Sequence, residues 1–235
     1  MHEVRVRTPA GIETGTLRDD AVLTDTGSYA VGAVEWCVPV APTAVYCVGR
    51  NYATTNAEMG YERPAEPTFF LKPPAALVAH EQPVSVPAFT DRLVGAGELA
   101  VVIGTTCREV APDDVDAVIR GYTILTDMDA RDQPTLSARK VFEAAAPVGP
   151  VVTDRVDPAA IAMRTTVDGE QVQGASTAEM LFDVPTVVAA LTSRITLHAG
   201  DLIAMGGPGN TGVLRPGQTV RVTYEGIGTL ETPIA

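Results

Sequence analysis

The feature that most constrains the fold of this chain is the stretch of residues 93–140, which holds two apolar runs that a sheet would bury. Glu98 opens the first run, and Asp127 and Asp129 follow the second. Runs of this kind are typical of strands in α/β and mixed-sheet proteins. A carboxylate beside a buried strand needs a cation, a donor or a proton. Both a functional site and structural ion pairs, for example with Arg131, would explain these carboxylates.

The length of 235 residues fits one large domain, with or without a small second unit. Residues 1–42 read as short strands joined by turns, whereas longer buried strands begin after them. We therefore expect a mixed α/β fold that is mainly β, with a small N-terminal β domain at residues 1–42 and the main domain at residues 43–235.

The formal net charge of −12 argues against nucleic acid or an anionic membrane as a partner, because the sequence has no basic stripe that could bind phosphates and release their counterions. No apolar run reaches membrane-spanning length, and the three cysteines lack metal-type spacing, so we expect a cytoplasmic protein. A small anionic substrate would have to be attracted by local cations. The candidates in apolar or glycine-rich surroundings are Arg50, Lys72, Arg131 and Lys140.

A glycine-rich loop at residues 206–212 follows an apolar strand near the end of the chain. Its backbone amides could cradle an anion. The same glycines would equally serve a tight bend that requires positive φ. The sequence leaves both interpretations open.

Several short blocks, in this order, resemble the fumarylacetoacetate hydrolase family. They are residues 49–52 (GRNY), 70–74 (FLKPP), 98–104 (ELAVVIG), 121–123 (GYT), 130–132 (ARD), Lys140, 147–150 (PVGP), 200–201 (GD) and 225–228 (EGIG). The resemblance implies a mixed β-sandwich roll preceded by a small β domain, and a homodimer. It also implies a substrate that is a small 2-oxo or 1,3-dicarbonyl acid, bound with Mg²⁺ or Mn²⁺.

The family's metal site is degenerate in this sequence. The resemblance assigns Glu98 and Asp127 as metal ligands, but Ala96 stands where the family has another glutamate. We therefore expect Mg²⁺ or Mn²⁺ to bind weakly or not at all. Asp129 is a possible replacement ligand. Otherwise it should pair with a neighbouring cation such as Arg131 or Lys140.

The remaining site residues are also implied by the resemblance. Lys140, Asp127 and Glu58 take catalytic positions, and Thr55 replaces the histidine that would activate water together with Glu58. The positions expected to bind substrate are Arg50, Asn51, Tyr52, Lys72, Gln133, Gly207 and Pro208.

Three functions remain open at this point. One is an enzyme that works through an enol or enolate without hydrolysis, as a tautomerase, decarboxylase, dehydratase or cyclase. Another is a Mg²⁺-dependent hydrolase of C–C bonds of the acylpyruvate or fumarylacetoacetate type. The last is a binding protein that keeps the fold without catalysis. Because general-base activation of water is worth roughly a hundred- to ten-thousandfold, the missing histidine favours the non-hydrolytic enzyme. The retention of Arg50, Glu98, Asp127 and Lys140 together favours an enzyme over a binding protein.

Overall fold

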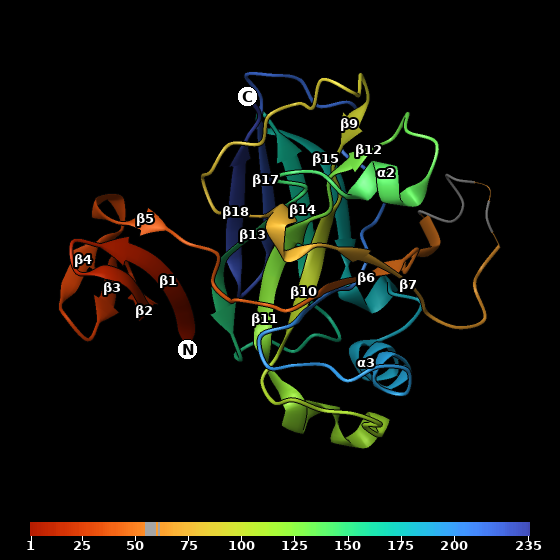
Figure 1. Ribbon diagram of the computed structural model, residues 1–235, viewed down its shortest axis with the longest axis horizontal. Coiled ribbons are helices and arrows are strands. Elements are labelled where there is room, and N and C mark those ends of the chain that lie inside the picture. The colour runs from red at the N-terminus through yellow and green to blue at the C-terminus, as the bar shows by residue number, and fades with distance from the viewer. Residues whose placement is uncertain (55–59, 61) are drawn as a thin grey trace.

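The protein is described by a computed structural model that covers residues 1–54, 60 and 62–235 (Figure 1). In chain order the strands are β1 (His2–Thr8), β2 (Gly11–Arg18), β3 (Ala21–Thr24), β4 (Ser28–Ala30), β5 (Glu35–Trp36), β6 (Val45–Gly49), β7 (Thr68–Lys72), β8 (Leu77–Ala79), β9 (Leu93–Val94), β10 (Gly97–Ile103), β11 (Ile119–Thr126), β12 (Asp129–Ala130), β13 (Ala146–Thr153), β14 (Ala162–Val167), β15 (Glu170–Ser176), β16 (Leu202–Ala204), β17 (Thr219–Tyr224) and β18 (Gly228–Pro233). The α-helices are α2 (Leu136–Lys140) and α3 (Val184–Thr192), and short 3-10 turns join several strands.

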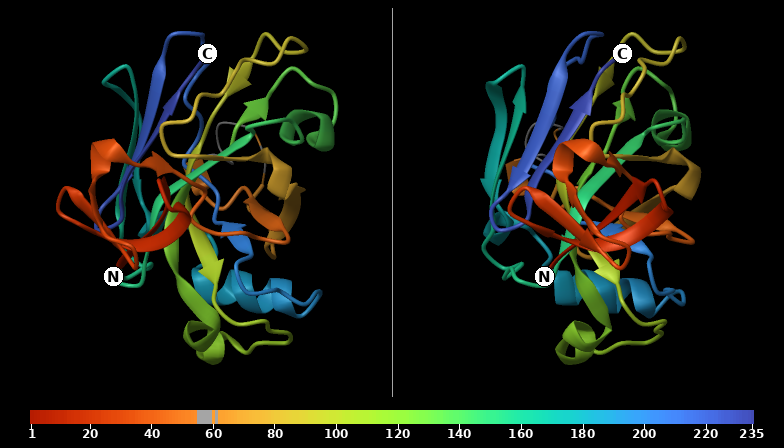
Figure 2. Two further views of the ribbon diagram at one scale, coloured as in Figure 1. Left: turned by 60° about the vertical axis from the view of Figure 1, so that its left-hand side comes forward. Right: turned by 90° about the vertical axis from the view of Figure 1, so that its left-hand side faces the viewer.

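Two packed sheets form the body of the molecule. Most strands belong to one large mixed sheet in the order β4-β3-β2-β1-β13-β11-β10-β16-β6-β7. Off this path, β5 pairs with β1 and β8 pairs with β13. A smaller antiparallel sheet has the order β15-β14-β17-β18 and lies against the large one (Figures 1 and 2). The mixed, mainly β fold that the sequence predicted is confirmed.

The first five strands gather at one side of the molecule, as Figure 1 shows in red and orange. They are not separate from the main sheet, because β1 continues it by pairing with β13, with His2 opposite Thr153. The predicted division between residues 42 and 43 therefore falls in a connection, after a β unit that shares backbone hydrogen bonds with the body. The division into two domains stays a prediction.

The centre of the large sheet is the antiparallel pair β10–β11, which comes from the stretch that dominates the sequence. Every side chain of β10 is buried, and its Val and Ile residues suit a pleated surface covered on both faces. The register pairs Gly97 with Thr126. It thereby brings Glu98, near the start of β10, close to Asp127, just beyond the end of β11.

The helix α3 begins after a capping residue, Asp183. The Asp183 side chain accepts a hydrogen bond from the Thr186 amide, and Pro185 occupies the first turn. Val187, Val188 and Leu191 face the core. No helix of the described chain is long and apolar enough to cross a membrane.

Candidate active site

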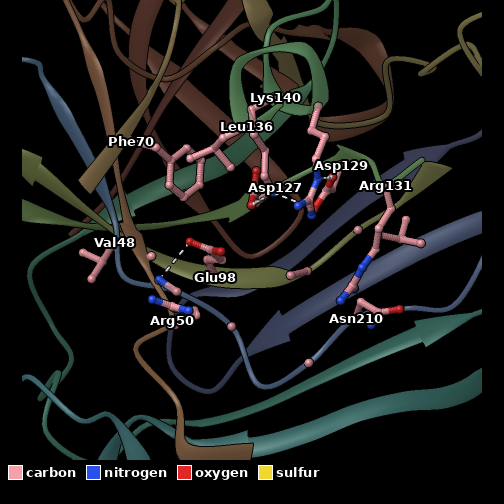
Figure 3. A pocket seen from close by; sticks show the side chains of 18 of the residues that line it. Val48, Arg50, Phe70, Glu98, Asp127, Asp129, Arg131, Leu136, Lys140 and Asn210 are labelled. Atoms are coloured by element: carbon pink, nitrogen blue, oxygen red, sulfur yellow. Dashed lines mark hydrogen bonds and ion pairs between the residues drawn. The ribbon is translucent and has the colours of Figure 1, made fainter. Parts of the chain in front are cut away.

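A pocket of about 430 Å³ opens where β10 begins and β11 ends, between the helix α2 and the loop of residues 206–212 (Figure 3). Its lining includes charged residues from four segments of the chain. They are Arg50, Glu98, Asp127, Asp129, Arg131, Arg139 and Lys140. The sequence predicted all of these as site residues or candidate cations except Arg139.

Glu98 projects from β10 into the pocket while remaining almost completely buried. Its Oε2 accepts a hydrogen bond from the Gly206 amide at 2.9 Å. Burial, and then repulsion from the Asp127 carboxylate, raise the pKa of Glu98 to about 8. This carboxyl therefore exchanges its proton near neutral pH.

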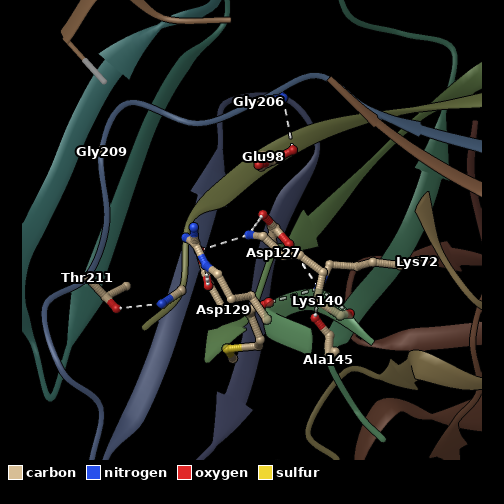
Figure 4. Close-up of polar contacts among 12 residues, drawn as sticks. Lys72, Glu98, Asp127, Asp129, Lys140, Ala145, Gly206, Gly209 and Thr211 are labelled. Carbon is tan, nitrogen blue, oxygen red and sulfur yellow. Dashed lines mark hydrogen bonds and ion pairs between the residues drawn. The ribbon is translucent and has the colours of Figure 1, made fainter. Parts of the chain in front are cut away.

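Asp127 lies at the bottom of the pocket and is held between two lysines (Figure 4). Its Oδ1 lies 2.9 Å from the Lys72 Nζ, and its Oδ2 accepts a hydrogen bond from the Lys140 Nζ. Burial acts to raise the pKa of Asp127, but the charges of Lys140 and Lys72 outweigh it and leave the pKa below its usual value. Asp127 is an ionised carboxylate.

Lys72 is fully buried behind Asp127 and is not among the residues that line the pocket. Besides the ion pair, its ammonium donates to the carbonyl oxygens of Met128 and Ala145, each at 2.8 Å. These partners direct its hydrogen bonds into the protein. The structure thus gives Lys72 the position of a support for Asp127, whereas the sequence suggested substrate contact.

Lys140 ends the short helix α2, which begins where the Thr135 side chain accepts a hydrogen bond from the Ala138 amide. Its ammonium contacts Asp127 and lies 3.2 Å from Asp129. Burial acts to lower the pKa of Lys140, but Asp127 and Asp129 reverse this effect and raise it. Lys140 is a permanent cation at this site.

Asp129 both lines the pocket and forms ion pairs. Lys140 was one of its expected partners, and Arg131, the other, is not found paired with it among the described residues. Arg139 is the stronger partner, since its Nε donates to Asp129 at 2.8 Å and its second guanidinium nitrogen also donates to that carboxylate. The position of Arg139 beside Lys140 on one helical turn was the signal that sequence reasoning missed.

Two residues of the GRNY block, Asn51 and Tyr52, lie in the protein interior. The Asn51 amide donates to the carbonyl oxygens of Phe182 and Met205, each at 2.9 Å, and Tyr52 is fully buried. Neither residue lines the pocket. Arg50 does line it, with a left-handed φ of 62°. The block therefore directs Arg50 into the pocket while the residues after it anchor the neighbouring loop.

Of the other predicted site residues, some line the pocket and some do not. Gly207 lines the pocket, whereas Pro208 and Gln133 are not among the lining residues. The Gln133 side chain instead donates to the Phe89 carbonyl at 2.6 Å. Glu58 and Thr55 lie outside the described residues, so the predicted catalytic position of Glu58 stays a prediction.

The glycine loop of residues 206–212 closes the pocket and is fastened to the start of β10. Gly206 has a φ of 83°, and a Cβ there would come within 2.9 Å of the Asn51 Cβ. This glycine allows a tight bend, and its amide donates a hydrogen bond to Glu98. Of the two open interpretations, the bend is the one that the geometry supports at Gly206.

Two polar side chains that sequence reasoning missed hold this loop. The buried Gln173 on β15 accepts from the Gly97 amide at 3.1 Å and donates to the Gly209 carbonyl at 2.9 Å. Thr211 accepts from the Gly95 amide at 2.9 Å. Gln173 thus connects the loop to the first residue of β10, and Thr211 connects it to the residue two positions before that strand.

The donor set does not fit a divalent metal ion. Within the described part of the chain, no group of three or more His, Cys, Asp or Glu side chains could hold one. Ala96 lines the pocket where the family resemblance places a glutamate, and the oxygens of Asp127 and Asp129 already contact cations.

The packed sheets and the pocket lined by paired carboxylates and cations define a mixed-β protein with a candidate active site. Residues 44–235 match the family described as fumarylacetoacetate (FAA) hydrolase, C-terminal. The chain belongs to the fumarylacetoacetate hydrolase family.

Several relatives and solved structures are similar over most of the chain. Protein Rv2993c of Mycobacterium tuberculosis is 41% identical over 88% of this chain and 81% of its own length. The oxaloacetate tautomerase YcgM of Escherichia coli is 34% identical over 77% of this chain and 88% of its own length.

Among solved structures, a 5-carboxymethyl-2-hydroxymuconate delta-isomerase from Mycobacterium smegmatis superposes with a TM-score of 0.92 at 33% identity. It covers 100% of this chain and 98% of that one. A maleylpyruvate hydrolase from Sphingobium sp. SYK-6, in complex with manganese (II) and pyruvate, has a TM-score of 0.88 at 27% identity. It covers 100% and 99% of the two chains. The similar proteins thus include a tautomerase, an isomerase and a hydrolase. These names support an enzyme of this family and leave the reaction open.

Proposed function

We propose that this chain interconverts the keto and enol forms of a small 2-oxo acid, with oxaloacetate as the first substrate to test. The observation that carries the proposal is the buried Lys140 ammonium, held by Asp127 and Asp129 at the wall of the pocket. The oxaloacetate tautomerases among the relatives support the choice of substrate.

Substrate recognition rests on the arginines of the pocket. Figure 3 shows Arg50 on one side of the pocket and Arg131 on the other, with Glu98 and Asp127 between them. A guanidinium binds a carboxylate through two parallel hydrogen bonds. Two of them at opposite sides suit a dicarboxylate, which a protein of net charge −12 has to attract through local cations.

The chemistry requires one proton acceptor and one stabilised oxyanion. Removal of a proton from C3 of a 2-oxo acid places negative charge on the C2 oxygen. A cation fixed in a buried pocket stabilises such a charge strongly, and Lys140 is that cation. Glu98, when ionised, accepts the C3 proton and delivers it to the C2 oxygen, which gives the enol, and the reverse transfers give the keto form. Because the reaction only moves a proton between carbon and oxygen, it needs no co-reactant.

A reaction without water addition agrees with the amino-acid sequence. Hydrolysis requires an activated water, and threonine at position 55 cannot act as the base that the family's histidine supplies. Decarboxylation would pass through the same enolate, with loss of carbon dioxide in place of proton return. The experiment therefore has to separate these reactions.

The test follows oxaloacetate with the purified chain in buffer containing a chelator. We expect saturable acceleration of C3 deuterium exchange by NMR, with a matching change in the ultraviolet absorbance of the enol and no pyruvate. Release of pyruvate at the same rate would indicate a decarboxylase. Cleavage of an acylpyruvate would indicate a hydrolase, and binding without any turnover would indicate a binding protein.

A further inference from the structure

Two carboxylates of the pocket, Asp127 and Asp129, are paired with cationic side chains of the chain itself. Asp127 contacts ammonium groups through both oxygens, from Lys72 at 2.9 Å and from Lys140 on the other side. A metal ion approaching Asp127 would have to displace at least one of these buried ammonium groups. The displaced group would then remain buried without its counter-charge.

Asp129 is occupied in a similar way. Arg139 binds it through Nε at 2.8 Å and through a second nitrogen, and Lys140 approaches to 3.2 Å. The guanidinium fork matches the geometry of a carboxylate, which makes this a strong pairing. Asp129 is therefore the partner of a cation pair and not an additional metal ligand.

The remaining wall of the pocket provides few ligands. Ala96 contributes only a methyl group, and the loop lies directly over it, because a Cβ on Gly207 would come within 3.1 Å of the Ala96 Cβ. Glu98 already uses Oε2 to accept from the Gly206 amide. The carboxylate that would complete a metal cage is missing at position 96.

We infer that Arg139 and Lys140 take the place of a divalent ion in this pocket, so that positive charge for an anionic ligand comes from side chains alone. Two fixed cations on one helical turn provide the charge of a divalent ion without needing an octahedron of oxygen ligands. This inference does not rest on the proposed reaction, because it is tested by ion binding in the absence of substrate.

The experiment titrates Mn²⁺ into the chelator-treated full chain and measures free Mn²⁺ by electron paramagnetic resonance. We expect no stoichiometric binding by the wild type. The substitution Ala96→Glu should raise the affinity at least about tenfold, because it restores a ligand charge. Ala96→Gln is the matched control, since it has the same size without the charge and should leave binding weak.

A second variant keeps the test decisive if Ala96→Glu fails to fold, as judged by circular dichroism. Arg139→Gln releases Asp129 from its guanidinium and should strengthen Mn²⁺ binding severalfold while leaving Ala96 in place. Tight stoichiometric binding by the wild type would overturn the inference. Weak binding that neither variant strengthens would overturn it as well, because the absent glutamate and the Arg139 cation would then not be what excludes the ion.

Discussion

Lys140 and Asp127, which lie 13 positions apart, are joined by an ion pair at the bottom of the pocket. The pair is buried, and Lys72 contacts the opposite oxygen of the same carboxylate. The pairing keeps the pKa of Lys140 above its ordinary value even though burial opposes this. A lysine that stays protonated cannot attack a carbonyl as an amine, so its chemistry is that of a fixed cation and hydrogen-bond donor.

The first prediction removes this cation. Lys140→Met keeps the length of the side chain and should lower turnover of oxaloacetate roughly a hundred- to thousandfold, as loss of an oxyanion donor does. Lys140→Arg is the control that keeps the charge and should retain more activity. Deuterium exchange at C3 measures both variants. Wild-type exchange by Lys140→Met would remove the main support of the enolate mechanism.

The second prediction concerns Gln173, which connects the start of β10 with the glycine loop. Gln173→Leu leaves the Gly97 amide and the Gly209 carbonyl without this partner and should cost about 1 to 3 kcal/mol of unfolding free energy. Because the loop carries the Gly206 amide that holds Glu98, turnover should fall as well.

The matched control is Gln171→Leu, an exposed position on the same strand β15. It should change neither the unfolding free energy nor turnover appreciably. Urea unfolding and steady-state kinetics on both variants check the prediction. Equal effects at the two positions would mean that Gln173 contributes to the strand and not to the pocket.

The sequence predicted those parts of the molecule that depend on local pattern. The apolar runs around Glu98 and Asp127 became the central strands because β-branched residues suit a sheet buried on both faces. Asp183 and Pro185 define the start of α3, since capping is a property of adjacent residues. Glu98, Asp127 and Lys140 came from the family resemblance, and the fold brings them to one pocket.

Long-range partners were harder to predict. Nothing local distinguishes Gln173 from other polar strand residues, since its partners are 76 and 36 positions away. Lys72 was predicted as a substrate ligand because it is a cation in apolar surroundings within the FLKPP block, yet backbone carbonyls far along the chain bind its ammonium. Arg139 was missed because its role depends on the orientation of a single helical turn. Such pairings are fixed by tertiary packing and leave no periodic trace.

The third prediction is a pH dependence of stability. The pKa of Glu98 is raised to about 8 from an ordinary value of 4.5, by burial first and by Asp127 second. The folded state therefore binds this proton more tightly than the unfolded state does. Its contribution to stability is complete below pH 4.5 and is lost as the pH rises toward 8. The lowered pKa of Asp127 acts below its ordinary value of 3.8, outside this window.

Glu98→Gln should remove this dependence, because the amide does not ionise. Between pH values of about 5 and 8, the wild type should lose roughly 1 to 4 kcal/mol of unfolding free energy relative to the variant. Urea unfolding at several pH values, in buffer with a chelator, measures the difference. Glu170→Gln, at an exposed position, is the control that should follow the wild type. Parallel curves for the wild type and Glu98→Gln would show that Glu98 titrates normally.

The last prediction separates the two ends of the substrate. If Arg131 binds the C4 carboxylate, which is attached to the reacting carbon C3, Arg131→Met should raise the KM for oxaloacetate roughly 10- to 100-fold, the value of a charged hydrogen bond. It should leave C3 exchange of pyruvate, which lacks that carboxylate, almost unchanged. Arg92→Met is the control, because Arg92 is exposed and its carbonyl pairs with the Arg131 amide at 3.0 Å. An equal loss on both substrates would place Arg131 at the C1 carboxylate that they share or in the fold, and an unchanged KM would remove it from the site.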